Sequence, residues 1–371
     1  MVINLIASKM ININNNEQKE IINKSWIEEI QKKDINEILQ SKEETIISLD
    51  ETFQNIDNIQ GLNTELYFHQ KIIIKAMNDL EQNRILKIKY NNNNYFQLKT
   101  NIGILSDPVG SGKTFNILGL ILLNKLPKIL KNVSMNPYNI DNIAKLNTTN
   151  SCKNTTLVTK QFKNILKPTL IFVGVAVINQ WINAIKTYTK LKYFKIINIY
   201  DLDTFMKLIK NKEINKYDVI IIKNGKVTRK PNEFPLYNLE IENKNQTSIL
   251  YIYNIISNLR NICWARVVID DYDTIHLPKN LGYINGCFTW YISSTKRYIN
   301  SSGDYGLDTY YTEDCLLYDS FDMYNFQKNP IIMKLLNIRN NPNFIKQSIN
   351  LNKPIIYAYK FKNKKIGRAH V

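Results

Sequence analysis

The chain has 371 residues, 44% of them hydrophobic, so it is long enough for about two domains and apolar enough to bury a stable core. Lys and Arg total 49 against 32 Asp and Glu, a formal net charge of +17 that favours polyanionic partners, with nucleic acid first among them. A competing explanation is compositional, because Asn, Ile and Lys are abundant in this chain and all three have AT-rich codons.

The cysteines and the apolar stretches argue against a zinc-binding, secreted or membrane-spanning protein. The N-terminal residues lack the apolar core and the cleavage site of a signal peptide. The longest apolar stretch, residues 115–126, is too short to cross a bilayer and predicts a buried helix. The cysteines form no C-x-x-C pair, which favours a reducing compartment; they are Cys152, Cys263, Cys287 and Cys315. We therefore expect an intracellular protein without a membrane segment.

Residues 1–60 are polar, and the segment 25–40 has the rough amphipathic spacing of helices, so we predict a helical N-terminal extension without chemistry. From residue 61 to 300, short apolar runs alternate with helix-like stretches. The predicted strands are residues 102–105, 169–174, 195–200, 217–222, 266–270 and 288–293. Several are nearly continuous in Ile and Val, which suits a parallel sheet covered by helices on both faces. The helical stretches between them predict βαβ crossovers and an α/β fold.

Other segments interrupt or follow this pattern. Residues 131–166 and 223–248 are long, polar and rich in Asn, Lys and Thr, which predicts insertions and favours disorder. The last six residues, 366–371, read IGRAHV, and their back-translation resembles a widely used sequencing adapter. We hypothesise that these six residues are not native and that the native protein continues beyond about residue 365, so that this chain is a truncated fragment.

Residues 106–115, SDPVGSGKTF, lie between the predicted strand 102–105 and a predicted helix over 114–126 that Pro127 ends. Strand, loop and helix in this order are the context of a phosphate-binding loop. Glycines let the backbone turn its N–H groups toward anionic oxygens, and the helix N-terminus adds a positive dipole. The residues predicted to bind ATP here are Gly110, Ser111, Gly112, Lys113 and Thr114.

Within this loop, Lys113 would supply a point charge at the β- and γ-phosphates, and the Thr114 hydroxyl would ligate Mg²⁺. A chance match is the alternative, because G-x-G-K-T is short. Asp107 stands where the full pattern has its first glycine. That glycine is often absent in superfamily-two helicases and translocases, and DPVGSGKT resembles the loop DEMGLGKT of Swi/Snf-type remodelling ATPases. This family carries further motifs in a fixed order, which the rest of the chain can test.

Two segments resemble the motifs that flank the phosphate loop in this family. Residues 65–77, ELYFHQKIIIKAM, are similar to the element L-x-x-H/Y-Q, in which Gln70 would read the adenine edge. The alternative is a surface Gln on an amphipathic helix. Residues 168–181 resemble motif Ia, a strand followed by a nucleic-acid-facing turn and a Gln-Trp helix start. A core strand and a buried Trp181 are compatible with the same residues. The match of residues 217–222 to the next family strand is weak.

Residues 263–280, CWARVVIDDYDTIHLPKN, resemble the family sequence WRRVILDEAHRIKN. The apolar strand delivers an acidic residue at its C-terminal end, beside the phosphate loop. The resemblance implies that Asp270 holds Mg²⁺. Asp271 stands where the family has the Glu that positions and deprotonates the attacking water, and Asp273 stands where it has His. Without the loop, a strand followed by an acidic turn would be the simpler interpretation.

Residues 288–295, FTWYISST, resemble motif III, which relays the nucleotide state to the nucleic-acid side. Ser293, Ser294 and Thr295 would form this coupling motif, although Ser/Thr-rich strand ends are common. Five elements in the family order span residues 65–295, so the chain resembles the first RecA-like lobe of a Swi/Snf-like superfamily-two helicase. The D-D-Y-D variant and the composition resemble the divergent helicases of nucleocytoplasmic large DNA viruses.

Two departures from the family bear on catalysis. Asp271 is one methylene shorter than Glu, and a carboxylate misplaced by about 1 Å costs on the order of a hundredfold in rate. Nothing after residue 300 resembles the second lobe, whose arginine fingers contribute on the order of a thousandfold or more. Residues 301–365 are interpreted as the approach to that lobe. We expect this fragment to bind ATP and to hydrolyse it poorly.

The resemblance implies an ATP-dependent DNA translocase or helicase that uses ATP and Mg²⁺. Nucleic acid, double-stranded DNA first, would bind near residues 174–181 mainly through its phosphates. A viral protein of this kind would act in the viral factory, host cytoplasm, nucleus or virion. Two alternatives stay open: a nucleotide-binding interaction module without catalysis, and another phosphate-loop NTPase such as a packaging or replication ATPase. The oligomeric state does not follow from the sequence.

Overall fold

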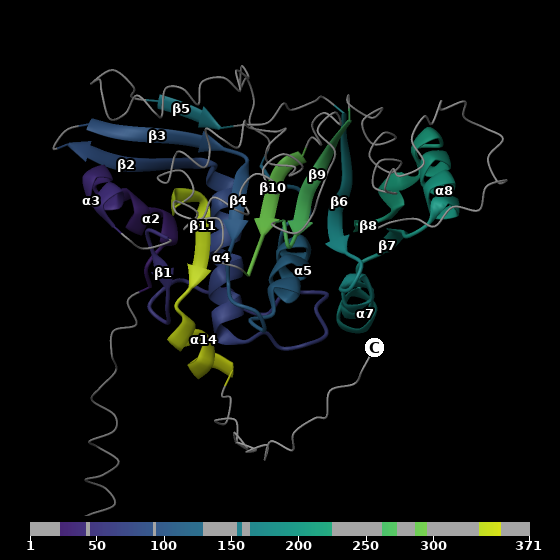
Figure 1. The fold of residues 1–371 in the computed structure, drawn as a ribbon, viewed down its shortest axis with the longest axis horizontal. Helices are drawn as coiled ribbons and strands as arrows, with labels where there is room; N and C mark the ends of the chain where they lie inside the picture. Colours follow the sequence, from purple (N-terminus) through teal and green to yellow (C-terminus); the bar gives the residue numbers. More distant parts are fainter. Residues whose placement is uncertain are drawn as a thin grey trace, which may run out of the picture.

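The computed structural model describes residues 23–41, 45–91, 94–128, 154–157, 164–224, 262–272, 286–294 and 334–349. Its centre is an eight-stranded sheet in which all neighbouring strands pair in parallel (Figure 1). From one edge to the other the strands are β1 (Ser48–Leu49), β11 (Asn337–Asn340), β4 (Ile102–Leu105), β10 (Gly286–Ile292), β9 (Ile262–Asp270), β6 (Asn164–Gly174), β8 (Val219–Asn224) and β7 (Tyr193–Ile196). This sheet confirms the predicted α/β, RecA-like class.

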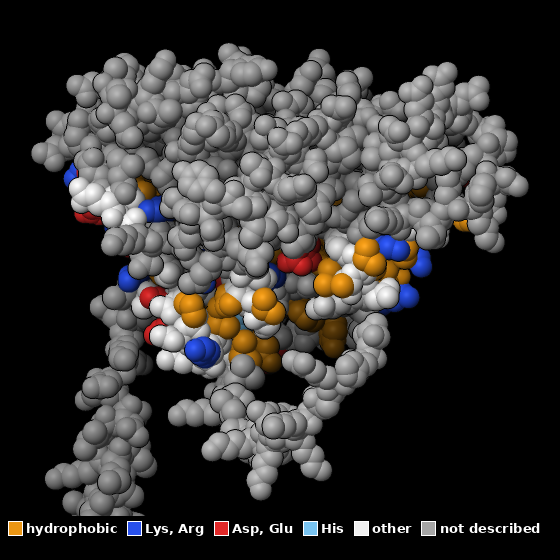
Figure 2. All heavy atoms as spheres, viewed as in Figure 1, with side chains coloured by type: hydrophobic (Ala, Val, Ile, Leu, Met, Phe, Trp, Pro, Cys, Tyr) orange, Lys and Arg blue, Asp and Glu red, His pale blue; other side chains and the backbone are white. Residues whose placement is uncertain are grey.

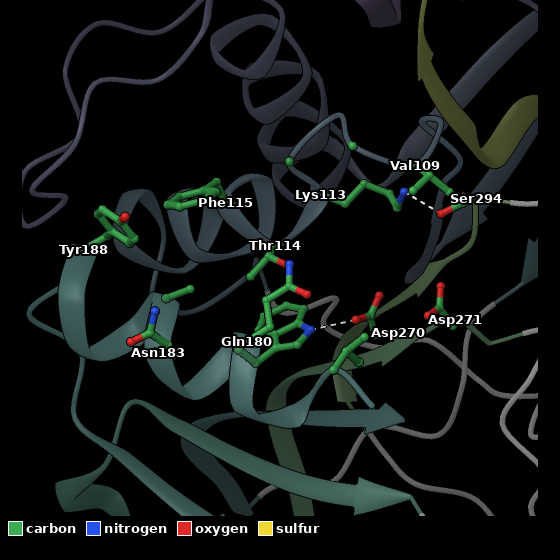
Figure 3. A pocket seen from close by; sticks show the side chains of 15 residues that line it. Val109, Lys113, Thr114, Phe115, Gln180, Asn183, Tyr188, Asp270, Asp271 and Ser294 are labelled. Carbon is green, nitrogen blue, oxygen red and sulfur yellow. Dashed lines mark hydrogen bonds between the residues drawn. The ribbon is translucent and has the colours of Figure 1, made fainter. Parts of the chain in front are cut away.

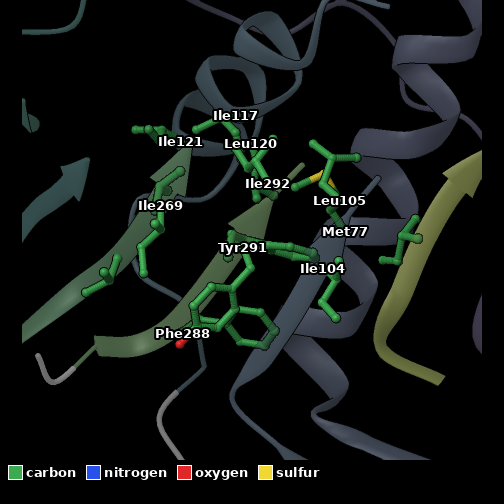
Figure 4. Close-up of a cluster of buried hydrophobic side chains, with 14 of the residues drawn as sticks. Met77, Ile104, Leu105, Ile117, Leu120, Ile121, Ile269, Phe288, Tyr291 and Ile292 are labelled. Atoms are coloured by element: carbon green, nitrogen blue, oxygen red, sulfur yellow. The ribbon is translucent and has the colours of Figure 1, made fainter. Parts of the chain in front are cut away.

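Helices connect and cover these strands. Their bounds are α2 (Trp26–Gln31), α3 (Ile35–Gln40), α4 (Phe68–Asn83), α5 (Lys113–Leu123), α7 (Ile178–Tyr188), α8 (Ile199–Lys210), the 3₁₀ turn η3 (Ile214–Lys216) and α14 (Pro342–Ile349). Helix α4 packs against α5 and β11, and α5 packs against α7. In Figure 4, Met77 of α4 and Leu120 of α5 lie over Leu105 and Ile292, at the ends of β4 and β10. These contacts fix α5, and the loop before it, against the sheet.

The central strands are buried because their residues are continuously apolar. Every residue of β4 and of β10 is buried, as expected for parallel strands covered on both faces. Strand β4 passes directly beside an indole ring of β10. A Cβ atom at Gly103 would lie 2.3 Å from the ring of Trp290, its partner in the register, so the close approach of β4 to this ring requires glycine.

A second sheet of three strands lies beside the first. It contains β2 (Ile85–Asn91), β3 (Asn94–Thr100) and β5 (Asn154–Leu157). Strands β2 and β3 pair antiparallel, and β3 and β5 pair in parallel. Leu86, Ile88 and Leu98 of this sheet are buried. The alternation of apolar and polar residues in ILKIKYN is the period-two pattern of a half-buried strand. The sequence therefore carried a signal for β2, but the predicted strands included only short runs of consecutive apolar residues.

Most predicted elements agree with the structure, and the predicted strand 195–200 is wrong in its second half. Strand β7 ends at Ile196, and α8 begins at Ile199. The cause is a capping box at Asn198, whose side chain accepts a 3.0 Å hydrogen bond from the Asp201 amide. In return, the Asp201 carboxylate accepts from the Asn198 amide. Helix α5 also ends at Leu123, before the predicted end at residue 126.

The predicted division of the chain differs from the structure at three places. The N-terminal extension contributes β1 to the edge of the main sheet, so it is not an appendage. The predicted insertion 131–166 contains β5 and the start of β6. The predicted linker 301–365 contains β11, which lies between β1 and β4, and α14, which packs on α4. Four-residue strands with mixed sequences carry little periodic signal, which is why β11 was not predicted.

Several predictions fall outside the described residues. They include those for residues 225–248 and 366–371, and for Asp273 and Thr295. Within the described part of the chain, no helix combines the length and the hydrophobicity that crossing a membrane requires.

Candidate nucleotide-binding site

The loop between β4 and α5 has the backbone shape that its glycines permit. Gly110 and Gly112 have φ angles of 83° and 82°, in the left-handed region that favours glycine. A Cβ atom at Gly110 would meet open space, whereas one at Gly112 would lie 2.2 Å from Gln70 Nε2. Gly112 is therefore required both by the backbone angle and by close packing, and Gly110 by the angle alone. Helix α5 begins at Lys113, so its N-terminus faces the loop.

A pocket of about 400 Å³ lies beside this loop, at the carboxyl ends of β9 and β10 (Figure 3). In open parallel sheets, ligands bind in the crevice outside the carboxyl ends of the strands. The pocket combines residues of the loop, of α5 and α7 and of the two strand ends. Its lining residues are Val109, Gly110, Gly112, Lys113, Thr114, Phe115, Val177, Gln180, Trp181, Asn183, Ala184, Tyr188, Asp270, Asp271 and Ser294.

The ammonium of Lys113 lies across the loop and reaches the end of β10. It donates to the carbonyl oxygens of Asp107 at 2.9 Å and Pro108 at 3.1 Å, and to Ser294 Oγ at 2.6 Å. All three acceptors are neutral oxygens. Phosphate oxygens, which carry charge, are stronger acceptors for the same ammonium. The contact with Ser294 joins the phosphate loop to the predicted coupling motif.

The strand end of β9 brings two carboxylates into the same pocket. Asp270 Oδ2 accepts a 2.6 Å hydrogen bond from Trp181 Nε1 of α7. Burial raises the pKa of Asp270 to about 6, and the negative charge of Asp271 adds to this rise. The hydrogen bond from Trp181 and the positive charge of Lys113 lower the pKa and so oppose the rise. Asp271 has a φ angle of 51°, which turns the chain immediately after the strand. Asp270 and Asp271 line the same pocket as the phosphate loop, and their catalytic and metal-binding roles stay predictions.

The donor set of this pocket fits a magnesium ion bound together with phosphates. Thr114 contributes a hydroxyl and Asp270 a carboxylate, and Mg²⁺ prefers oxygen ligands of this kind, with phosphates and waters completing its shell. The open space above Gly110 and the helix N-terminus at Lys113 suit the anionic oxygens that would accompany the metal.

Some predicted site residues are buried and do not line the pocket. Gln70 is buried; its Oε1 accepts from the Tyr67 amide at 2.9 Å, and its Nε2 lies 3.5 Å from the Ser111 carbonyl. Its contact with adenine stays a prediction. The Ser111 side chain is also buried, so its expected contribution is that of its backbone. Ser293 is buried, and its amide donates to the Leu105 carbonyl at 3.1 Å.

Asp107, the departure from the glycine pattern, anchors the loop to β11. Its carboxylate is fully buried and accepts 2.8 Å hydrogen bonds from both the backbone amide and the Nδ2 of Asn340. Burial raises the pKa of Asp107, and the two bonds from Asn340 oppose that rise. No sequence signal connects these residues, which lie 233 positions apart. Only the strand order brings β11 beside β4.

A second contact also supports the loop from below. The buried His69 ring lies with Nε2 3.0 Å from the Ser111 carbonyl and with Nδ1 3.0 Å from Ser348 Oγ of α14. Burial lowers the pKa of His69. The phosphate loop is thus tied to the β11–α14 segment through Asp107 and through His69, neither of which was predicted as a site residue.

A family model described as the SNF2-related domain matches residues 69–283 of this chain. The chain belongs to the SNF2-related domain family. The resemblance inferred from the motifs is thereby confirmed. The SNF2-related match includes the phosphate loop, α7 and the carboxylates of Asp270 and Asp271. It ends before β10, β11 and α14, so the contacts with Ser294, Asn340 and Ser348 come from outside the matched residues.

This SNF2-related chain is similar to two further proteins. A protein of Acanthamoeba polyphaga mimivirus that carries a helicase name is 26% identical over an alignment 324 residues long, and the match covers 69% of this chain and 36% of that protein. The solved SWI2/SNF2 ATPase core of Sulfolobus solfataricus, in complex with double-stranded DNA, superimposes with a TM-score of 0.38 and 14% identity over 78% of this chain and 47% of that one. This chain spans about a third of the mimivirus protein.

Proposed function

We propose that this chain is the first motor lobe of an ATP-dependent DNA translocase or helicase and that it binds ATP with Mg²⁺. One observation carries the proposal: Lys113, Thr114, Asp270 and Asp271 line a single pocket beside a glycine-shaped loop in an SNF2-related lobe. In this proposal Lys113 holds the β- and γ-phosphates, and Thr114 and Asp270 hold the metal. Asp271 orients and deprotonates the attacking water.

The same proposal assigns nucleic acid to the turn before α7. Residues 175–177 form this turn at the end of β6, and Val175 is 53% exposed. The formal net charge of +17 favours the phosphates of DNA, and binding held mainly through phosphates weakens as salt rises. The substrate, double-stranded DNA first, remains part of the proposal, as does an intracellular site of action.

A second lobe, contributed by the longer protein, would complete the ATPase. Four exposed apolar side chains in the segments that begin α4, form the phosphate loop and follow β6 are candidate contacts for such a lobe, because apolar surface of this kind is found at interfaces between proteins. They are Tyr67, Phe68, Val109 and Val175, and each is at least 39% exposed. Figure 2 shows hydrophobic side chains on the lower part of the described surface, with acidic side chains nearby. ATP turnover is assigned to the two-lobed protein.

The nucleotide site is tested by replacing Lys113 with Ala and measuring the affinity of a fluorescent ATP analogue in the presence of Mg²⁺. We expect binding to weaken about tenfold or more, because a charge-assisted hydrogen bond contributes about 1.5–3 kcal/mol. The matched control is Lys125→Ala, which removes the same charge from a side chain that is 72% exposed and outside the pocket. A Lys113→Ala protein that binds as tightly as the parent would refute the site.

An alternative function is a nucleotide-binding module without turnover, and the shorter carboxylate of Asp271 favours it. Measuring DNA-stimulated ATP turnover of the longer protein separates the two. Turnover that rises with DNA supports the motor, and zero turnover under all DNA conditions supports the module. A longer protein without an arginine-bearing second lobe would instead support a different phosphate-loop NTPase.

A further inference from the structure

Trp181 contacts the carboxylate that is proposed to hold magnesium. Its side chain is 1% exposed and comes from the first turn of α7, whereas Asp270 ends β9. The indole Nε1–H donates to Asp270 Oδ2 at 2.6 Å, which is short for a hydrogen bond to a carboxylate (Figure 3). Both residues line the nucleotide pocket. The contact therefore lies at the metal site as well as in the core.

The chemistry of this contact differs from ordinary core packing. An indole is a donor only, so its one polar atom can be satisfied here by an acceptor such as the carboxylate. The carboxylate is 9% exposed and has a second acidic residue, Asp271, next to it. A fixed neutral donor holds such a group in one orientation without neutralising it. In metal sites, groups that hydrogen-bond to a ligand commonly set its direction and affect metal affinity.

We propose that Trp181 is a positioning residue for magnesium: its indole N–H orients the Asp270 carboxylate toward the metal that accompanies the nucleotide. This inference rests on the proposed ATP–Mg²⁺ function. It also gives α7 a second role, since this helix follows directly from the turn at residues 175–177. The part of the lobe proposed to contact nucleic acid is thereby joined to the metal site by one hydrogen bond.

The test replaces Trp181 with Phe, which keeps an aromatic ring and removes the N–H group. Binding of a fluorescent ADP analogue is measured at increasing Mg²⁺ concentration and again in EDTA. We expect the Mg²⁺ concentration needed for half-maximal enhancement of binding to rise about tenfold, the lower end of the effect of removing such supporting contacts. Binding in EDTA should stay unchanged, because the phosphate loop is untouched.

Trp290→Phe is the matched control. The Trp290 indole also donates to a buried carboxylate, Glu81 Oε1 at 2.8 Å, but Trp290 does not line the pocket. We expect Trp290→Phe to lower the unfolding temperature and to leave the Mg²⁺ dependence at the parent value. If Trp181→Phe also leaves the Mg²⁺ dependence of binding at the parent value, Trp181 is a core residue only. If the parent binds no nucleotide with Mg²⁺, the proposed function fails and this inference fails with it.

A measurement on the parent protein covers the case in which Trp181→Phe does not fold. The chain has four tryptophans, and the indole N–H signals of ¹⁵N-labelled protein report each one separately by NMR. With ADP already bound, adding Mg²⁺ should move the Trp181 signal and leave the Trp290 signal in place. A Trp181 signal that Mg²⁺ does not move would overturn the proposal.

Discussion

Asp271 combines a short side chain with an unusual backbone conformation. Its φ angle of 51° lies in the left-handed region, where short polar residues are tolerated and longer ones are disfavoured. The Swi/Snf-like pattern has Glu at this position. The aspartate fits the local backbone conformation better than Glu, but its carboxylate extends less far from the backbone. The substitution therefore has a structural reason in the turn that follows β9.

We predict that Asp271→Glu raises basal ATP turnover about tenfold, because the added methylene brings the carboxylate about 1 Å closer to the attacking water. The same change should lower the free energy of unfolding by about 1 kcal/mol, since Glu is strained at this φ angle. Phosphate release and urea unfolding measure the two effects. Asp271→Asn, which removes the proposed base and keeps the shape of the side chain, is the control and should lower turnover. A decrease in turnover for Asp271→Glu would show that aspartate already reaches the water.

At the scale of secondary-structure elements, strand β11, which lies between β1 and β4, supports the phosphate loop. Asp107 receives two hydrogen bonds from Asn340, and the Ser106 amide donates to the Ile338 carbonyl at 3.3 Å. The loop is thus attached to β11 as well as to its own strand β4. Nucleotide binding and the position of the β11–α14 segment should affect each other, because coupling between two sites is reciprocal.

Asn340→Ala tests this attachment, because it removes the Nδ2 donor and leaves the backbone bond to Asp107. We predict that the free energy of unfolding falls by about 1–3 kcal/mol, the cost of leaving a buried acceptor short of a partner. We also predict faster amide hydrogen exchange in residues 107–112 and weaker binding of the fluorescent ADP analogue. Asn343→Ala, at an exposed position at the start of α14, is the control. Equal exchange and equal affinity in both variants would contradict the attachment.

For the molecule as a whole, a buried polar network joins the helices to the sheet. Arg266 of β9 forms two 2.6 Å hydrogen bonds with the carboxylate of Glu81 in α4, and both side chains are fully buried. Arg266 also donates to the Asn124 carbonyl at the end of α5, and Trp290 of β10 donates to Glu81. Each charge is paired and hydrogen-bonded, which is the condition for tolerating it in a core.

We predict that Glu81→Leu lowers the free energy of unfolding by about 3–5 kcal/mol, because the guanidinium of Arg266 would stay buried without its carboxylate. Urea unfolding followed by circular dichroism measures this loss. The matched control removes an exposed ion pair: Lys125→Ala breaks the 3.4 Å contact with Asp218 and should cost about 1 kcal/mol or less. A similar loss for the two variants would mean that the network adds little to stability.

Local pattern was enough to indicate those parts of the candidate site that are contiguous in the chain. The phosphate loop could be recognised because Gly110 and Gly112 stand at the positions where the backbone turns, between an apolar strand and a helix. The acidic end of β9 could be recognised because an Ile/Val run delivers Asp270 to the edge of the sheet. Each signal lies within about ten residues, the range over which strand and helix periodicity operate.

Tertiary structure alone decided which distant residues support that site. The pairs Trp181–Asp270 and Asp107–Asn340 lie 89 and 233 positions apart, and neither is marked by a sequence pattern. Asp107 and Asn340 meet because the strand order places β11 beside β4. Trp181 and Asp270 meet because β6, the strand that precedes α7, pairs with β9. The sequence by itself determined the α/β fold, the glycine-containing loop between β4 and α5, and the family. The packing of the sheet determined how this loop and the Asp270 carboxylate are held, because burial and hydrogen bonding act between neighbours in space.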